Sequence, residues 1–184
     1  LLLGRITIDD VVDVIRDQAE HNLMSMAGLD EDEDMFAPVL THVRRRSVWL
    51  GVNLVSTFTA AFVISLFSGT LEKLVALASL MPIVASMGGV AGNQTVVLMI
   101  RGMALGQVDI SNLRSILLRE LAVGALNGLL LALVVGSVAF FWFGSTGIGL
   151  TIAAALICNL LIAALAGGAI PLLLRKIGVD PALA

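Results

Sequence analysis

Charged residues and the side chains that enzymes use are scarce in this sequence. Only 14% of the 184 residues are charged and 58% are hydrophobic, and the mean hydropathy is +1.00. In an ordinary soluble domain about 25% of the residues are charged, so the composition excludes that class. The sequence predicts a membrane protein.

The chain has one cysteine and two histidines, and neither type forms a recognisable site. Cys158 cannot form an intrachain disulfide, and the apolar run around it predicts a small core residue. His21 and His42 are isolated and lack metal-ligand spacing, which favours surface or packing roles. No phosphate-binding loop, no Ser, His and Asp order typical of a nucleophile, and no paired carboxylates within an apolar run are found. We therefore expect no enzymatic activity.

Four apolar runs are each near or above the roughly 20 residues that cross a hydrocarbon core of about 30 Å. The predicted fold class is an all-α membrane protein, a polytopic helical bundle with four transmembrane helices, preceded by a cytoplasmic amphipathic helix. The expected domains are an N-terminal helix and acidic linker over residues 1–47 and a transmembrane domain over residues 48–184. The runs are Val48 to Ser68, Leu74 to Ile100, Leu121 to Phe143 and Ile148 to Leu174.

Basic residues cluster at alternate ends of these runs. Arginines fill residues 44–46 before the first run, and Arg101, Arg114 and Arg119 lie between the second and third. The link between the first and second runs holds one basic residue, Lys73, and the link between the third and fourth runs holds none. By the positive-inside tendency we expect a multi-pass protein of the inner (plasma) membrane with a cytoplasmic N-terminal segment. Arginines directly before an apolar run indicate a membrane anchor and no nucleic-acid partner.

The N-terminal segment has the pattern of an acidic amphipathic helix. Thr7 and Asp10 form a variant of the capping box, and apolar residues keep helical spacing from Ile8 to Gly28. On its polar face, carboxylates recur about once per turn, and like charges at that spacing repel. The face is either a solvated acidic surface or a ladder that binds a hard divalent cation through oxygen ligands. Its acids are Asp9, Asp13, Asp17 and Glu20.

The second apolar run differs from a plain membrane helix, because it carries a proline, three close glycines and two amides. Polar groups at membrane depth usually face a bundle interior or a water-filled path. Two interpretations stay open: close helix packing with bonded amides, or a path lined by backbone carbonyls and amide oxygens. Elsewhere in the runs Asn53, Asn127 and Asn159 are expected to bond neighbouring helices, and Glu72 is a candidate cation attractor. The residues alone indicate a transporter or channel for a hydrated cation.

The stretch MPIVASMGGVAGNQTVVLMIRGMALGQ resembles the second membrane helix of the MgtE-type magnesium channel family. ITIDDVVDVIRDQAEHNLMSMAG resembles that family's passage from its regulatory domain into the helix that plugs the pore, and VDPALA is similar to the start of its fifth membrane helix. The resemblance covers essentially the whole chain. It implies a homodimer in membrane lipid, with a pore between second and fifth helices, and Mg²⁺ as both the transported and the regulatory ion. Cytosolic regulatory domains of the full-length chain are the further implied partners.

The resemblance also assigns residues to the pore and to metal binding. Those implied to line the pore are Asn93, Gly88, Gly89, Gly92, Gln94 and Asp180. Those implied to meet the metal are Asp9, Asp13, Asp17, Glu20 and Glu72. Val90 stands where many family members have Asn, which removes one amide from the expected path. The start without Met and the end before the family's fifth-helix carboxylate suggest a fragment in which no ion site is complete.

The expected function is therefore Mg²⁺ uptake through a channel or transporter that cytosolic Mg²⁺ gates through the acidic plug helix. Two alternatives stay open at this point. One is a transporter for another divalent cation, Mn²⁺ or Co²⁺. The other is a non-conducting dimeric membrane module, whose glycine face only brings two copies together.

Overall fold

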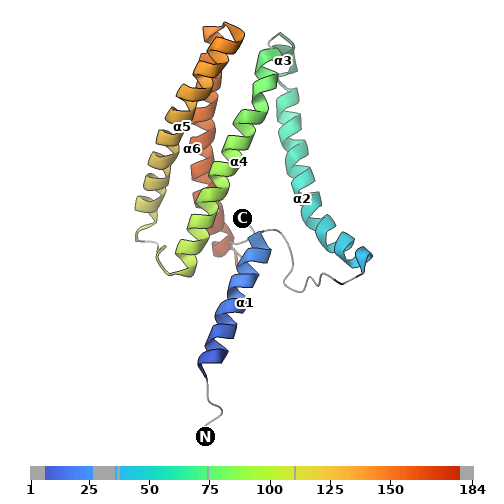
Figure 1. Cartoon of the computed structure of the whole chain (residues 1–184), viewed down its shortest axis with the longest axis vertical. Helices are drawn as coiled ribbons and strands as arrows, with labels where there is room; N and C mark the ends of the chain where they lie inside the picture. Colours follow the sequence, from blue (N-terminus) through green and yellow to red (C-terminus); the bar gives the residue numbers. More distant parts are fainter. Residues whose placement is uncertain (1–6, 27–35, 37, 74, 110, 179–184) are drawn as a thin grey trace. The chain divides into compact units, whose positions relative to one another are not determined.

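The computed structural model describes residues 7–26, 36, 38–73, 75–109 and 111–178. Over these residues the chain is entirely helical apart from turns and short links, as Figure 1 shows, and it contains no strand. The helices are α1 (Ile8–Met26), α2 (Val39–Ser65), α3 (Ser68–Lys73), α4 (Val75–Ala104), α5 (Leu113–Phe143) and α6 (Thr146–Lys176). The predicted all-α fold class is confirmed.

Four of these helices, α2, α4, α5 and α6, are long and apolar enough to cross a membrane. The prediction of four spans is confirmed, but the helices extend beyond the apolar runs at most of their ends. For example, α2 begins at Val39 rather than Val48, directly after Pro38, whose carbonyl accepts a bond of 2.9 Å from the Thr41 N–H. An apolar run marks only the hydrocarbon depth, whereas polar interface residues continue the backbone hydrogen bonds.

The predicted N-terminal helix is present as α1 and ends at Met26, near the expected Gly28. The Asp10 carboxylate accepts hydrogen bonds of 2.7 Å from the Thr7 backbone N–H and 2.8 Å from the Thr7 hydroxyl. These bonds stabilise the charged form, so the pKa of Asp10 lies below its ordinary value of 3.8. The predicted capping interaction is confirmed.

The chain divides into two compact units at residue 64. The first unit holds α1 and nearly all of α2, and no described residue of α2 is buried within the chain. The second unit holds α3, α4, α5 and α6. Its core is built around Leu156, which is 0% exposed, together with Leu80, Ala139, Ile152 and Leu160.

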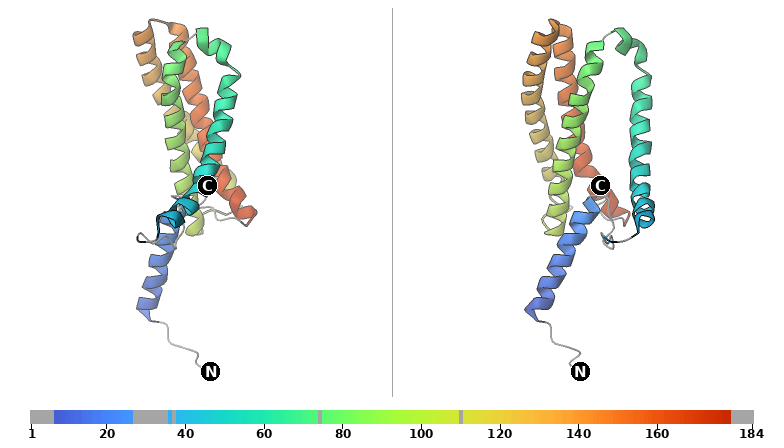
Figure 2. Two further views of the ribbon diagram at one scale, coloured as in Figure 1. Left: turned by 90° about the vertical axis from the view of Figure 1, so that its right-hand side faces the viewer. Right: turned by 45° about the vertical axis from the view of Figure 1, so that its right-hand side comes forward.

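Within the second unit, α6 is the central helix. It packs along the length of both α5 and α4, while α4 and α5 contact each other only slightly. Figures 1 and 2 show these three helices running alongside one another. One side of α4 is therefore fixed by α6, and this arrangement decides which α4 residues are covered.

Small residues allow α5 and α6 to approach closely. Gly124, Gly128, Ala132 and Gly136 recur every four residues along α5, and all are buried. A Cβ atom at Gly149 of α6 would lie 2.8 Å from the Gly136 carbonyl oxygen. Membrane helices associate through such close packing, because lipid supplies no hydrophobic drive between them.

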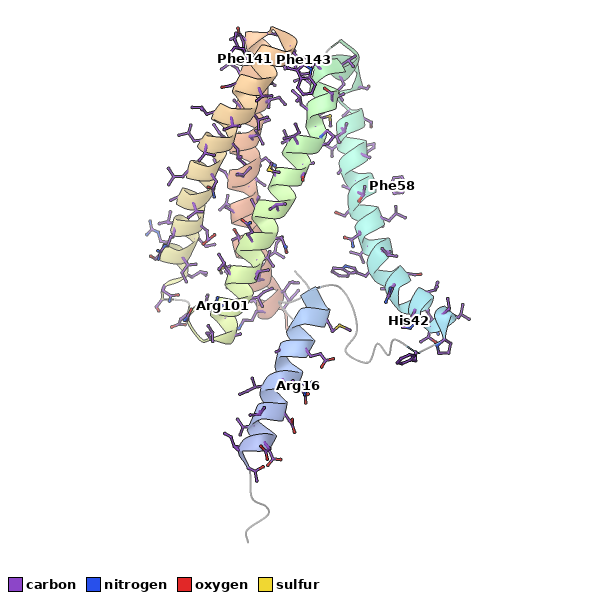
Figure 3. All side chains as sticks on the ribbon, viewed as in Figure 1. Arg16, His42, Phe58, Arg101, Phe141 and Phe143 are labelled. Carbon is purple, nitrogen blue, oxygen red and sulfur yellow. The ribbon has the colours of Figure 1, made fainter. Side chains whose placement is uncertain are left out.

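The two ends of the second unit differ in chemistry. Aromatic residues gather at the end of α5, where the Trp142 and Phe143 rings stack with centroids 5.9 Å apart. Figure 3 shows Phe141 and Phe143 at this end of the unit and Arg101 of α4 at the opposite end. Aromatic and basic belts of this kind are typical of the two interfaces of a membrane.

Candidate functional site

The helix α4 has one covered face and one open face. Leu80, Gly88 and Thr95 are buried, and α4 packs against α6. Gly89 and Asn93 lie four residues apart on another face, and both are exposed within the chain. The open face therefore combines a glycine with an amide at membrane depth.

The three glycines of this stretch have different surroundings. A Cβ atom at Gly88 would lie 2.6 Å from Oδ1 and 2.8 Å from Cγ of Asn159 on α6, so any larger residue there would force the Asn159 side chain to shift. At Gly92 the nearest atoms of Ala163 would be 3.8 Å away, which is an ordinary contact. At Gly89 no described atom lies within 4 Å. The family resemblance groups the three residues, but the chain's own packing demands only Gly88.

The two adjacent amides also differ. Side chains of neighbouring helical residues are about 100° apart. Gln94 lines a small cavity of about 70 Å³ between α4, α5 and α6, which also borders Thr95, Glu120 and Asn127. Asn93 does not line that cavity. Gln94 is also exposed, but of the two amides only Asn93 lies four residues from Gly89 and shares its face.

Two polar interhelical bonds hold α4 in place. Nδ2 of Asn159 on α6 donates to the Val84 carbonyl oxygen at 2.6 Å. The Thr95 hydroxyl donates to Oε2 of Glu120 on α5 at 3.2 Å, and Thr95 is only 6% exposed. The prediction that Asn159 bonds a neighbouring helix is confirmed. The sequence predicted no role for Thr95. The feature that could have indicated this bond is Glu120, an acid near the end of an apolar run.

The acids of α1 lie on one continuous helix and are exposed. Among the residues that the structure describes, no three His, Cys, Asp or Glu side chains are close enough together to hold a metal ion. The helix carries Asp9, Asp13, Asp17 and Glu20.

Two further predicted site residues lie outside the described side chains. Glu72 belongs to α3, but its side chain is not among those described, and Asp180 lies outside the described residues. The expectation that Cys158 is a core residue is wrong, because it is exposed on α6. An apolar run does not show which side of a helix faces protein, since lipid-facing positions are equally apolar.

These features define a polytopic helical membrane protein in which one spanning helix exposes a glycine and an amide on the same face. The family model MgtE, described as a divalent cation transporter, matches residues 81–184. This match covers more than half of the chain, and the chain belongs to the MgtE family of divalent cation transporters. The predicted resemblance is thereby confirmed, and so is the expectation of a transporter family rather than an enzyme.

Three relatives carry the name magnesium transporter MgtE. The proteins of Bacillus subtilis (strain 168), Thermus thermophilus and Enterococcus faecalis are 29%, 33% and 32% identical to this chain. The alignments cover 100%, 99% and 100% of this chain but 41%, 41% and 40% of the relatives. The chain thus spans about two fifths of the length of the curated relatives it matches.

Proposed function

We propose that the full-length protein moves Mg²⁺ across the membrane and that the open face of α4 forms one wall of the ion path. The observation that carries the proposal is Gly89, a helical glycine that no described neighbour requires. The names of the relatives support Mg²⁺ as the ion.

A glycine inside a helix is less favourable than alanine by about 1 kcal/mol. Gly88 has a reason for that cost in the side chain of Asn159, whereas Gly89 has none among the described residues. A missing Cβ uncovers backbone carbonyl oxygens, which non-protein partners such as ions or water can then approach. Gly89 therefore fits a surface whose partner is an ion, water or a second chain.

Asn93 supplies the matching side-chain oxygen on the same face. It lies four residues beyond Gly89, about 6 Å along the helix at 1.5 Å per residue. Mg²⁺ loses its water reluctantly, so neutral oxygens at this spacing suit an ion that keeps several of its waters. Gly88 then supports the wall because Asn159 of α6 packs against it, the Gly92 carbonyl oxygen lies against Gly167 of α6, and Gln94 flanks the wall.

One helix cannot enclose a path, so a second wall is needed. We propose that a second copy supplies it, which gives a homodimer with two α4 faces across the path. Asp180 and Glu72 are the acids proposed for its two ends. The basic clusters at alternate helix ends support a cytoplasmic N-terminal segment.

Regulation by cytosolic Mg²⁺ is proposed for α1. Its exposed carboxylates repel one another, and an ion shared with the cytosolic domains would relieve that repulsion and favour a closed state. Asp13→Asn with Asp17→Asn should weaken inhibition by internal Mg²⁺ in the full-length protein. The acidic linker after this helix has five consecutive acids at residues 30–34. Asp30→Asn with Glu31→Gln removes the same charge from that linker and is the control. Unchanged inhibition in the first variant would count against this gate.

The transport proposal is tested by Mg²⁺ flux into proteoliposomes that contain the full-length protein. Asn93→Leu should strongly reduce the flux, because it removes the amide oxygen from the proposed wall. Asn127→Leu, a matched amide change on α5 away from the open face, should largely retain the flux. Co²⁺ and Ca²⁺ as competitors separate Mg²⁺ transport from transport of another divalent ion. If no divalent ion moves, the transport proposal fails. If Asn93→Leu abolishes only dimer formation, the non-conducting module is favoured.

A further inference from the structure

A large apolar groove lies at the end of the second unit that carries Arg101. It has a volume of about 740 Å³ and is formed by the start of α5, the end of α6 and the link between α4 and α5. Leu113 and Leu117 line it from α5, and Ala169, Leu172 and Leu173 line it from α6. Its walls are therefore mainly aliphatic.

The groove is long enough to cover about two thirds of one leaflet of a bilayer. Ala169 and Lys176 are seven residues apart on α6, which corresponds to about 10 Å along the helix. Half of a typical hydrocarbon core is about 15 Å. An acyl chain that entered beside Lys176 could thus follow the leucines over most of its own leaflet.

The mouth of the groove is positively charged. Arg175 and Lys176 line it from the last turn of α6, and Asp109 lines it from the link, so the local formal charge is +1. All three residues are exposed. The carbonyl end of a helix by itself repels anions, and the two cations offset this effect. Basic groups beside an apolar groove at a membrane interface are the chemistry that binds acidic lipid head groups.

We propose that this groove binds one anionic phospholipid, with its phosphate at Arg175 and Lys176 and an acyl chain along the leucines. The site is separate from the open face of α4 and does not depend on the proposed transport. The phosphate and the mouth of the groove carry opposite charges, and the aliphatic wall lies directly beyond the mouth. Both features favour a lipid over a soluble anion.

The lipid would also touch the turn that ends α4. Val108 lines the groove, and its Cγ2 lies 2.8 Å from the position of a Cβ atom at Gly102. The Gly102 carbonyl oxygen accepts bonds of 2.8 Å from the Gln107 N–H and 3.2 Å from the Val108 N–H. The bound lipid therefore braces the end of the helix that forms the proposed wall.

The test compares lipid retention by the full-length protein in native mass spectrometry, with phosphatidylglycerol and phosphatidylcholine of identical acyl chains. Arg175→Gln with Lys176→Gln should lower the preference for phosphatidylglycerol about 30-fold, since each cation near a membrane surface contributes about fivefold. Arg114→Gln with Arg119→Gln removes the same charge outside the groove and should leave the preference unchanged. Lys176→Gln alone, with an expected fivefold loss, serves if the double variant does not fold.

The apolar part of the groove is tested separately. Ala169→Trp fills it without changing charge and should lower retention of both lipids. If the variant Arg175→Gln with Lys176→Gln prefers phosphatidylglycerol as strongly as the unchanged protein does, the proposal is overturned. So does strong competition by soluble glycerol 3-phosphate, which would indicate a phosphate site without a lipid. Retention of neither lipid would mean that another part of the full-length chain fills the groove, and it would also overturn the proposal.

Discussion

The substitution Gly167→Ala adds a methyl group to α6. This group should push α6 away from α4, the helix that forms the proposed wall. A Cβ atom there would lie 2.6 Å from the Gly92 carbonyl oxygen and 2.9 Å from the Thr95 Cβ. Ordinary contacts begin near 3.4 Å, so α4 and α6 must move apart by about 0.8 Å (3.4 minus 2.6). The nearest atom belongs to the backbone and cannot rotate away, unlike the end of a long side chain.

The size of the effect follows from two opposing contributions. Overpacking of this kind costs about 1–3 kcal/mol, and the better helix propensity of alanine returns up to about 1 kcal/mol. Gly167→Ala should therefore destabilise the protein by up to about 2 kcal/mol. Gly89→Ala gains the same propensity and meets no described atom within 4 Å. The two variants, each a mid-helix Gly→Ala change, should differ by about 1–3 kcal/mol, which is the cost of overpacking alone.

Thermal unfolding of the full-length protein in detergent measures this difference. Gly167→Ala should have a midpoint several degrees below that of Gly89→Ala, with the unchanged protein between them or close to Gly89→Ala. If both variants unfold together, or if Gly167→Ala is the more stable, the close α4–α6 contact is wrong. The assignment of covered and open faces of α4 would then lose its basis.

Two further predictions concern α4 and α1. Asn159→Ala should lose about 0.6–1.7 kcal/mol with its bond to the Val84 carbonyl. Gly88→Ala should destabilise the otherwise unchanged protein, but it should destabilise the Asn159→Ala variant much less. In this double-mutant cycle, an equal loss of stability in both backgrounds would refute the contact. The lowered pKa of Asp10 means that its contribution is present above pH 3.8 and is lost as pH falls through the folded value. The protection of amides near Thr7 against hydrogen exchange, measured relative to the intrinsic rate at each pH, should fall as pH drops through that value, and Asp10→Asn should remove this acid dependence.

The number of spans could be predicted from sequence, because the thickness of the bilayer sets the length that an apolar run needs in order to cross it. The helix ends could not, since residues such as Val39 lie before the apolar run, where hydropathy gives no signal for the start of the helix. The capping of α1 was predictable because Thr7 and Asp10 are three residues apart. Local chemistry of that kind is visible in the order of residues.

The two faces of α4 could not be assigned from sequence. Gly88 and Gly89 are adjacent and identical, and only the position of Asn159, far along the chain on α6, distinguishes them. The bond between Thr95 and Glu120 likewise joins residues 25 positions apart. Such pairs depend on which helices are neighbours, and hydropathy carries no information about that.

The central claim is that Asn93 faces a water-filled path for Mg²⁺. It is tested most directly by Asn93→Cys in full-length protein from which the exposed Cys158 has been removed as Cys158→Ala. A charged, water-soluble thiol reagent should modify the new cysteine and block Mg²⁺ flux, and Mg²⁺ should slow the modification. Leu133→Cys, at an apolar position of α5 that is 70% exposed, is the control and should react little. An unreactive Asn93→Cys in a protein that still carries Mg²⁺ would contradict the account.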